Sequence, residues 1–319
     1  MNTILLVLDA LRYDHVTKEI TPNLMKLIER SANFIDAHSC NTSTIESMPC
    51  IICGQKEYDP EKNIATALNG HGVHTAMIHS NPMIHAFYSG FKETIDLKSK
   101  KFKMSKGFRK SLRRNLPPSI IKQLKKVRAT VQKDDEYLPY ARADETLIFT
   151  EEWMRDNENY FLWAHLMDPH IPYYPMKTLS GLSKHEMRTL NDKIIESVHG
   201  NYSPNQDETK TALQLYKEDI FEMDMALGPL LENIPEDTFL IITSDHGEEF
   251  GEHGQYSHHS DKYIPELTHV PLIIRGPGVL PRTLTERVST MSITATIIEA
   301  HGFSDSLGEA TSLYQMISK

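Results

Sequence analysis

Short, nearly continuous runs of aliphatic and aromatic residues recur along the chain, and polar residues follow each of them. The runs are residues 4–8, 73–78, 160–164, 239–242 and 270–274. Such runs are typical of strands that are buried on both faces, as in a parallel sheet covered by helices. Helical patterns alternate with them at residues 21–30, 144–157 and 206–231. This alternation predicts an α/β fold with a mostly parallel central sheet sandwiched by helices.

Residues that bind metals or anions follow four of the predicted strands. They are Asp9, Asn81, the group His165, Asp168 and His170, and the pair Asp245 and His246. In open α/β sheets, ligands bind beyond the carboxyl ends of the strands. A single Asp after a strand would mean little, but four such strand ends predict one site at that edge of the sheet.

Residues 244–254 are the densest group of potential ligands, with three glycines, two histidines and four carboxylates directly after a predicted strand. An isolated Asp-His pair is more often part of a polar loop. Here the density and the position favour a divalent cation bound by Asp245 and His246, around which the glycines let the backbone turn.

These motifs resemble the sulfatase-like branch of the alkaline phosphatase superfamily. The resemblance rests on residues 7–14, 21–24, 167–173, 245–247, 251–254, Tyr263 and 270–278, in the family's order. It implies an alkaline phosphatase/sulfatase-like catalytic domain over residues 1–319, with a reduced C-terminal subdomain. It also implies that Asp9, Asp245 and His246 bind a divalent metal, with one site expected and Mn, Mg, Zn or Ca as the candidate ions.

The nucleophile position departs from the sulfatases, whose Cys-x-Pro-x-Arg signature supplies a formylglycine. Counting back from Gly54, the resemblance implies Thr44 at the Cys position, with Glu46 and Met48 in place of the Pro and the Arg. Related phosphatases, phosphodiesterases and phosphoethanolamine or phosphoglycerol transferases use Thr or Ser there. The resemblance therefore implies that Thr44 acts unmodified as the nucleophile and as a fourth metal ligand.

Elementary physics also favours Thr44, because a hydroxyl at a helix N-terminus faces unpaired N–H groups and the positive end of the helix dipole. Pro49 fits such a helix if the helix begins a residue or so after Thr44, which leaves the proline in the first turn. The alternative is that Thr42, Ser43, Thr44 and Ser47 form a loop rich in capping residues.

Other residues have weaker signals, and ordinary loop hydrogen bonding is the alternative for each. We expect His170 and His258 to hold the ester oxygens or to protonate the leaving group, with His259 beside them, and Asn81 to donate to a bound oxyanion. Asp168 and His170, two residues apart, are candidates for a second metal site. The Cys50-x-x-Cys53 pair is expected to lie in a packed helix and to have no redox role.

Composition narrows the class of protein. The chain has 319 residues, of which 39% are hydrophobic, so a disordered chain is excluded. Its apolar runs are far shorter than the roughly 18 residues of a membrane-spanning helix. The N-terminus has no basic region of the signal-peptide type. The three cysteines suggest no disulfide framework, and together these features predict a cytoplasmic protein.

Charge is unevenly distributed along the chain. Residues 98–133 contain ten Lys and four Arg but no Asp or Glu, so all 43 acidic residues lie elsewhere. The family resemblance does not explain this basic insertion. One interpretation is that the segment is a solvated basic helix. The other is that it binds an anionic membrane surface or a lipid-linked substrate, since each Lys or Arg near such a surface adds about 1 kcal/mol to the binding free energy. No groove-reading motif accompanies the segment, so specific nucleic-acid binding is not expected.

The predicted function is a metal-dependent hydrolase of phosphate or sulfate esters that acts through a Thr44 nucleophile and a covalent intermediate, with phosphoesters favoured. A phosphoethanolamine- or phosphoglycerol-type transferase would use the same site, with an alcohol in place of water. From another class, a catalytically silent homologue that only binds anions is the remaining alternative.

Overall fold

A computed structural model describes residues 1–98, 137–260 and 262–318. Its centre is an eight-stranded sheet with the order β11-β2-β10-β7-β1-β6-β4-β5. The strands of this sheet are β1 (Thr3–Leu8), β2 (Ala32–Phe34), β4 (His74–His79), β5 (Glu93–Asp96), β6 (Tyr160–Leu166), β7 (Phe239–Thr243), β10 (Leu272–Arg275) and β11 (Arg282–Leu284). Two small two-stranded sheets pair β12 (Val288–Ser289) with β3 (Ala37–His38), and β8 (Glu249–Phe250) with β9 (Tyr256–Ser257).

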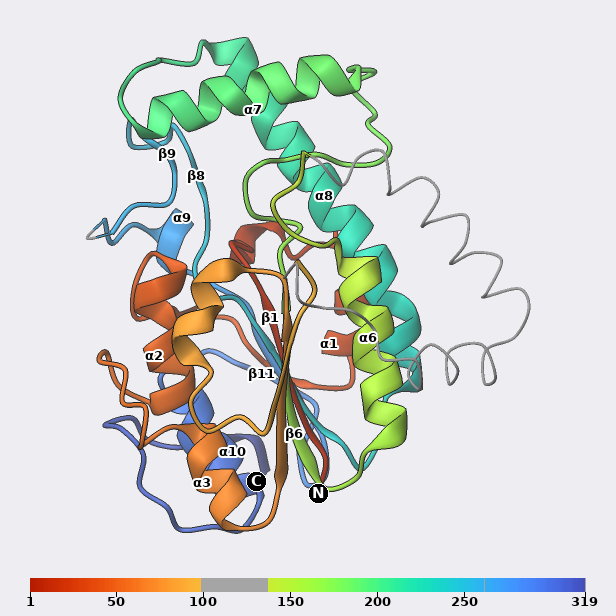
Figure 1. The fold of residues 1–319 in the computed structure, drawn as a ribbon, viewed down its shortest axis with the longest axis vertical. Coiled ribbons are helices and arrows are strands. Elements are labelled where there is room, and N and C mark those ends of the chain that lie inside the picture. The colour runs from red at the N-terminus through yellow and green to blue at the C-terminus, as the bar shows by residue number, and fades with distance from the viewer. Residues whose placement is uncertain (99–136, 261, 319) are drawn as a thin grey trace.

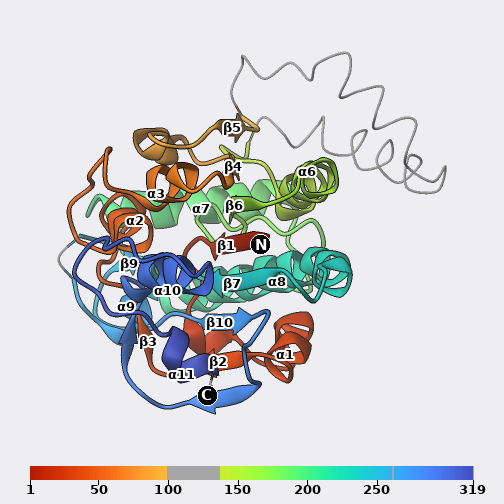
Figure 2. The same cartoon turned by 90° about the horizontal axis from the view of Figure 1, so that it is seen from below.

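Helices cover both faces of the sheet (Figures 1 and 2). On one face lie α1 (Pro22–Ile28), α6 (Ala143–Asp156) and α8 (Gln206–Asn233), with α7 (Lys184–Val198) packed on α8. On the other lie α2 (Thr44–Cys53), α3 (Ile64–Gly70), α10 (Ser292–Ala300) and α11 (Tyr314–Ser318). Short segments complete the described chain: η1 (Tyr13–His15), η2 (Pro82–Phe87) and α9 (Pro265–Thr268).

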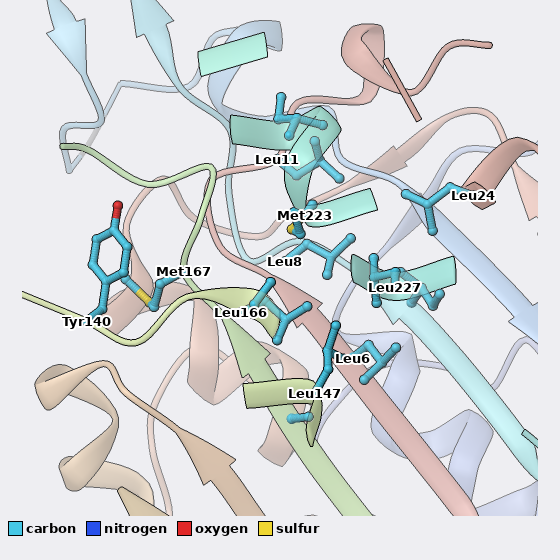
Figure 3. Close-up of a cluster of buried hydrophobic side chains, with 14 of the residues drawn as sticks. Leu6, Leu8, Leu11, Leu24, Tyr140, Leu147, Leu166, Met167, Met223 and Leu227 are labelled. Atoms are coloured by element: carbon cyan, nitrogen blue, oxygen red, sulfur yellow. The ribbon is translucent and has the colours of Figure 1, made fainter. Parts of the chain in front are cut away.

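The central strand β1 shows why its sequence is continuously apolar. Its side chains alternate between the two cores, with Ile4, Leu6 and Leu8 in one and Leu5 and Val7 in the other. All five are fully buried. Figure 3 shows Leu6 and Leu8 among side chains of the α1, α6 and α8 face. A strand that is covered on both faces has no solvent side and therefore no polar alternation.

The predicted strands and helices are confirmed, and so is the α/β fold with a mostly parallel sheet. The strands β5, β4, β6, β1 and β7 run parallel, so their carboxyl ends meet at one edge. The predicted strand at residues 270–274 corresponds to β10, which runs antiparallel to both of its neighbours.

Helix α7 is not among the predicted helices, although its sequence contains a start signal. Ser183 and Glu186 form a capping box at its N-terminus, and a Ser followed three residues later by Glu is a recognised start signal. Met187, Leu190 and Ile194 form its buried face at helical spacing.

Residues after β10 supply β11 to the same sheet and α10 and α11 to the core on the α2 face. One domain over residues 1–319, with a reduced C-terminal subdomain, stays our prediction. Of the basic insertion at residues 98–133, only Lys98 lies within the described residues. Across the three described ranges, no helix has both the length and the apolar character needed to cross a membrane.

Candidate active site

Asp9, Asp245 and His246 form a compact group at the carboxyl edge of the sheet. Asp9 follows β1 directly, and Asp245 and His246 follow its parallel neighbour β7. One ligand atom from each residue lies within 4.8 Å of the others, and all three residues are fully buried. Within the described residues, this is the one group of three or more His, Cys, Asp or Glu side chains with such spacing. The predicted convergence of these strand ends is therefore confirmed.

The free atoms of this group fit a divalent cation. Asp9 Oδ1 and Asp245 Oδ2 are buried and have no hydrogen-bond partner in the structure. They lie 3.7 and 3.5 Å from His246 Nε2. Two unpaired carboxylate oxygens cannot remain buried together without a compensating positive charge. A donor set of two carboxylates and one imidazole suits Zn²⁺, Mn²⁺ or Mg²⁺.

Backbone groups fix the orientation of these ligands. Asp245 Oδ1 accepts hydrogen bonds from the N–H groups of Ala10 (3.2 Å) and His246 (3.0 Å), which leaves Oδ2 free. His246 Nδ1 donates to the Gly247 carbonyl at 2.8 Å, so Nε2 has its lone pair available for a metal. Ala10 has a left-handed φ of 60°, an uncommon conformation for a residue other than glycine.

Asp9 is held by donors from two further strands. His165, in β6, lies with Nε2 2.9 Å from Asp9 Oδ2. Asn81, which follows β4, donates its side-chain amide to the same oxygen at 3.1 Å. The structure thus places Asn81, the expected oxyanion donor, against Asp9, a predicted metal ligand. Asn81 also accepts a hydrogen bond from the Met83 N–H and so caps the N-terminus of η2.

Thr44 lies at the start of α2 and within reach of this group. Its Oγ1 lies 3.3 Å from His246 Nε2 and 3.5 Å from Asp9 Oδ2. Ser43 makes no side-chain capping hydrogen bond, so it leaves the first N–H groups of the helix available to an anion. The structure therefore brings together Asp9, Thr44, Asp245 and His246, the four predicted metal-binding residues.

The expected start of α2 is wrong. The helix includes Thr44 as its first residue, which places Pro49 in its interior and not in the first turn. An interior proline costs roughly 3 kcal/mol because it lacks the N–H of one helical hydrogen bond. Met48, Ile51 and Ile52 are fully buried in the core on this face. Their burial offsets that cost, at about 1.5–3 kcal/mol for each side chain.

The expectation of no disulfide is also wrong. Cys40 and Cys50 form a disulfide bond whose loop encloses Thr44. A spacing of ten residues is no recognisable signal, because the two cysteines meet only when α2, which contains Cys50, packs beside residue 40. Disulfides are typical of oxidising compartments, so the cysteines no longer support the predicted cytoplasmic location. Cys53 is buried and free, and burial raises its thiol pKa to about 11.

His170 and His258 lie beside the group formed by Asp9, Asp245 and His246. The ring centroid of His258 is 4.2 Å from that of His246 and 5.0 Å from that of His170. His258 Nδ1 lies 3.1 Å from Glu248 Oε1, and Glu248 is fully buried. The carboxylate therefore fixes which His258 nitrogen faces the site. His259 instead bonds the Tyr256 carbonyl through Nε2, at 3.0 Å.

Asp168 does not accompany His170. Residues 167–170 form a turn closed by the hydrogen bond from the His170 N–H to the Met167 carbonyl, so the segment is not extended as the spacing argument assumed. Asp168 instead lies near Arg142 and the N-terminus of α6, and burial raises its pKa to about 7. The predicted contribution of Asp168 to a second metal site is therefore not supported.

The buried charges of the site influence one another. Burial by itself would raise the pKa of Asp9, but His170, His165 and His246 bring it well below its usual range. Burial and the neighbouring His246 lower the pKa of His258. Burial would also lower the pKa of His246, but Asp245 and Asp9 raise it above its usual value. Asp9 therefore stays ionised and ready to bind a cation.

Sequence reasoning missed the contacts of two residues. His165 is predicted only as a residue near a strand end, and Glu248 has no predicted role. His165 sits inside β6, where an apolar residue is the expectation, and a histidine within an otherwise apolar buried strand is the signal that could have identified it.

Comparison with known proteins identifies the family of this chain. A model of the sulfatase family matches residues 1–303. The phosphoethanolamine transferase EptA of Helicobacter pylori is 24% identical over 266 residues, which are 81% of this chain and 43% of that protein. A choline-sulfatase of Rhizobium meliloti is 26% identical over 109 residues, which are 33% of this chain and 21% of that protein. The chain thus spans less than half the length of these curated relatives.

Solved structures share the fold. The phosphonate monoester hydrolase of Silicibacter pomeroyi has a TM-score of 0.67 at 18% identity, over 99% of this chain and 76% of that one. The soluble domain of the lipooligosaccharide phosphoethanolamine transferase A of Neisseria meningitidis has a TM-score of 0.61 at 18% identity, over 93% and 86% of the two chains. Likeness at such identities establishes the fold alone. The family model, in contrast, matches nearly the whole chain, and the chain therefore belongs to the sulfatase family.

Proposed function

We propose that this chain is a metal-dependent hydrolase of phosphate or sulfate esters in which Thr44 is the nucleophile. The observation that supports this is the position of Thr44 Oγ1, which lies 3.3 Å from His246 Nε2 and 3.5 Å from Asp9 Oδ2. Asp9, Asp245, His246 and Thr44 would hold the metal. When bound, a divalent metal acts as a Lewis acid that lowers the pKa of a hydroxyl and neutralises anionic charge.

Each residue of the site has its own part in the proposed reaction. Thr44 Oγ1 forms a bond to the phosphorus or sulfur of the ester as the bond to the leaving alcohol breaks. The proton that the Thr44 hydroxyl loses passes through His258 or His170 to the departing oxygen, and water later cleaves the Thr44 ester. The Asn81 amide has one N–H on Asp9 and a second N–H for an ester oxygen. Phosphoesters are favoured, because the Cys and Arg of the formylglycine route are absent.

A transferase is the second candidate. If an alcohol replaces water, the same covalent intermediate passes its phosphoryl group to that acceptor. The names of two relatives, both phosphoethanolamine transferases, favour this alternative. A silent anion-binding protein would have no need for both a hydroxyl and an unpaired carboxylate pair at one point.

The proposal is tested with p-nitrophenyl phosphate, bis(p-nitrophenyl) phosphate and p-nitrophenyl sulfate, before and after chelation and after addition of Mn²⁺, Zn²⁺, Mg²⁺ or Ca²⁺. We expect phosphoester turnover that chelation abolishes and metal restores. Asp245→Asn should abolish it, whereas Asp237→Asn, an exposed substitution, should not. Full activity after chelation would contradict the metal assignment, and sulfate turnover above both phosphate activities would reverse the substrate ranking.

We also propose that the ester is lipid-linked or presented at an anionic membrane surface, with the basic residues of 98–133 as the contact. Both flanks of this segment support the idea. Residue 98 follows the carboxyl end of β5, at the same edge as the site, and Tyr140 donates to the His170 carbonyl at 2.8 Å. Co-sedimentation with vesicles of phosphatidylcholine and phosphatidylglycerol should fall from low to high salt and after deletion of residues 100–130. Equal, negligible binding in every condition would contradict it.

A further inference from the structure

Arg12 joins the two segments that supply the metal-binding residues. It lies three residues after Asp9, and only 6% of its surface is exposed. Its Nη1 donates to the Glu248 carbonyl at 3.1 Å and to Glu252 Oε1 at 2.6 Å. Its Nε and Nη2 donate to the two carboxylate oxygens of Asp14 at 2.9 and 2.7 Å. One guanidinium thus bonds a carboxylate of its own segment and two acceptors of the loop that follows His246.

The surroundings allow these two segments little freedom to slide. The Leu11 N–H donates to Ser244 Oγ at 2.9 Å, which adds a second connection near Asp245. A Cβ atom on Gly247 would lie 2.0 Å from the Glu266 carbonyl oxygen and 3.1 Å from Arg12 Cγ. The stem of Arg12 therefore packs directly against the loop backbone, next to His246. Tyr216 bonds both the Arg12 N–H and the Ala10 carbonyl, which holds the other segment.

We infer that Arg12 is a positioning residue of the metal site: its guanidinium sets the spacing between Asp9 and the pair Asp245 and His246. This inference rests on the proposed function, since it concerns affinity for the proposed metal. A planar guanidinium can bond a carboxylate with two parallel N–H groups and still reach acceptors on its other side. A lysine ammonium is a single point of contact and cannot do both.

The consequence of losing Arg12 follows from this arrangement. Without it, the Glu248 carbonyl and the carboxylates of Asp14 and Glu252 lose a shared donor, and nothing else described joins Asp14 to Glu252. The loop is then free to relax away from Asp9. Metal sites tolerate ligand displacements of only about 0.2 Å, so a small relaxation weakens metal binding before it unfolds the protein.

The test compares Arg12→Lys with Arg275→Lys as a matched control. Arg275 is also buried and also bonds a carboxylate, Glu236, and two carbonyls, those of Ile234 and Pro235, but it lies at the opposite edge of the sheet. We measure the Kd of chelated protein for Mn²⁺ and for Zn²⁺ by calorimetry, together with the thermal unfolding of the metal-free protein.

We expect Arg12→Lys to raise the metal Kd about tenfold or more, the size seen when residues that orient metal ligands are lost. Saturating metal should then restore most of kcat. Arg275→Lys should lower the unfolding temperature and leave the Kd within about twofold. If Arg12→Lys does not fold, Glu252→Gln weakens the same connection and should also raise the Kd. An unchanged Kd in a folded Arg12→Lys or Glu252→Gln variant overturns this inference alone; parent protein that binds neither metal overturns the proposed function together with it.

Discussion

His165 Nε2 lies 2.9 Å from Asp9 Oδ2, and both side chains are fully buried. Asp9 uses this oxygen for hydrogen bonds to His165 and Asn81, so its other oxygen, which has no partner, lies 3.7 Å from His246 Nε2. Metal-binding carboxylates are commonly oriented in this way, by a neighbouring group that hydrogen-bonds to the oxygen that does not face the metal.

Replacement of His165 should therefore weaken metal binding. We expect His165→Ala to raise the metal Kd 10- to 100-fold, because Asp9 loses the donor that orients it and an imidazole that keeps its pKa low. Calorimetric titration of chelated protein with Zn²⁺ or Mn²⁺ measures the change. His185→Ala, an exposed substitution in α7, is the control. A parent-like Kd for His165→Ala would show that Asp9 needs no such support.

Thr44→Ala should remove the chemistry and leave metal binding weakened but present, since Asp9, Asp245 and His246 remain. Neighbouring hydroxyls are the control: Ser43→Ala should retain activity, because the Ser43 hydroxyl donates to the Glu46 carboxylate and, among the described residues, bonds no member of the site. Ser47→Ala removes a buried hydroxyl that contacts Ser39, and we expect lower stability with retained turnover. Mass spectrometry of acid-quenched protein locates the covalent adduct. An adduct on Ser47 would refute Thr44 as the nucleophile.

The buried carboxyl of Asp168 predicts a pH dependence of stability. Burial raises its pKa from 3.8 to about 7, against the opposing effect of Arg142. The folded state therefore favours the protonated acid. The stability that this group contributes is complete below pH 4 and is lost as the pH rises to 7, at up to about 1.4 kcal/mol per pH unit.

Asp168→Asn keeps the shape of the neutral acid and removes this titration. We expect the variant to gain stability relative to the parent as the pH rises from 5 to 8, measured by urea unfolding at each pH. Asp192→Asn, on α7, is the control and should show no such trend. Parallel stability curves for parent and Asp168→Asn would mean that Arg142 keeps the carboxylate charged throughout.

The Cys40–Cys50 disulfide closes a loop with a sequence separation of ten residues. By the chain-entropy relation, removal of a disulfide that closes a loop of this size lowers the free energy of unfolding by about 2–3 kcal/mol. We expect the Cys40→Ala, Cys50→Ala double variant to show this loss, whereas Cys53→Ala should leave the disulfide intact. Mass spectrometry after alkylation of the unfolded, unreduced protein should find one free thiol, at Cys53. Three alkylated thiols would contradict the disulfide.

Much of the fold was predictable from the sequence because its cause is local. The side chains of β1 and β7 are buried on both faces, so their sequences are continuously apolar and identify them as central strands. The same reasoning predicted that Asp9 and Asp245 would meet, because parallel strands end at one edge. It could not predict that β10 runs antiparallel, since buried strands of either direction have the same apolar character.

The orientation of side chains within the site was decided only by the tertiary structure. Asp168 and His170 lie two residues apart in the chain, yet a turn sends one toward Arg142 and the other toward His258. The start of α2 at Thr44 and the pairing of Cys40 with Cys50 depend on how α2 packs. The amino-acid sequence by itself determined which residue types gather at the carboxyl edge, because strand periodicity and strand ends are local properties. The tertiary structure decided which atoms bond Asp9 and how Arg12 connects the segments of Asp9 and His246. These contacts join residues up to 240 positions apart, and no local pattern encodes such contacts.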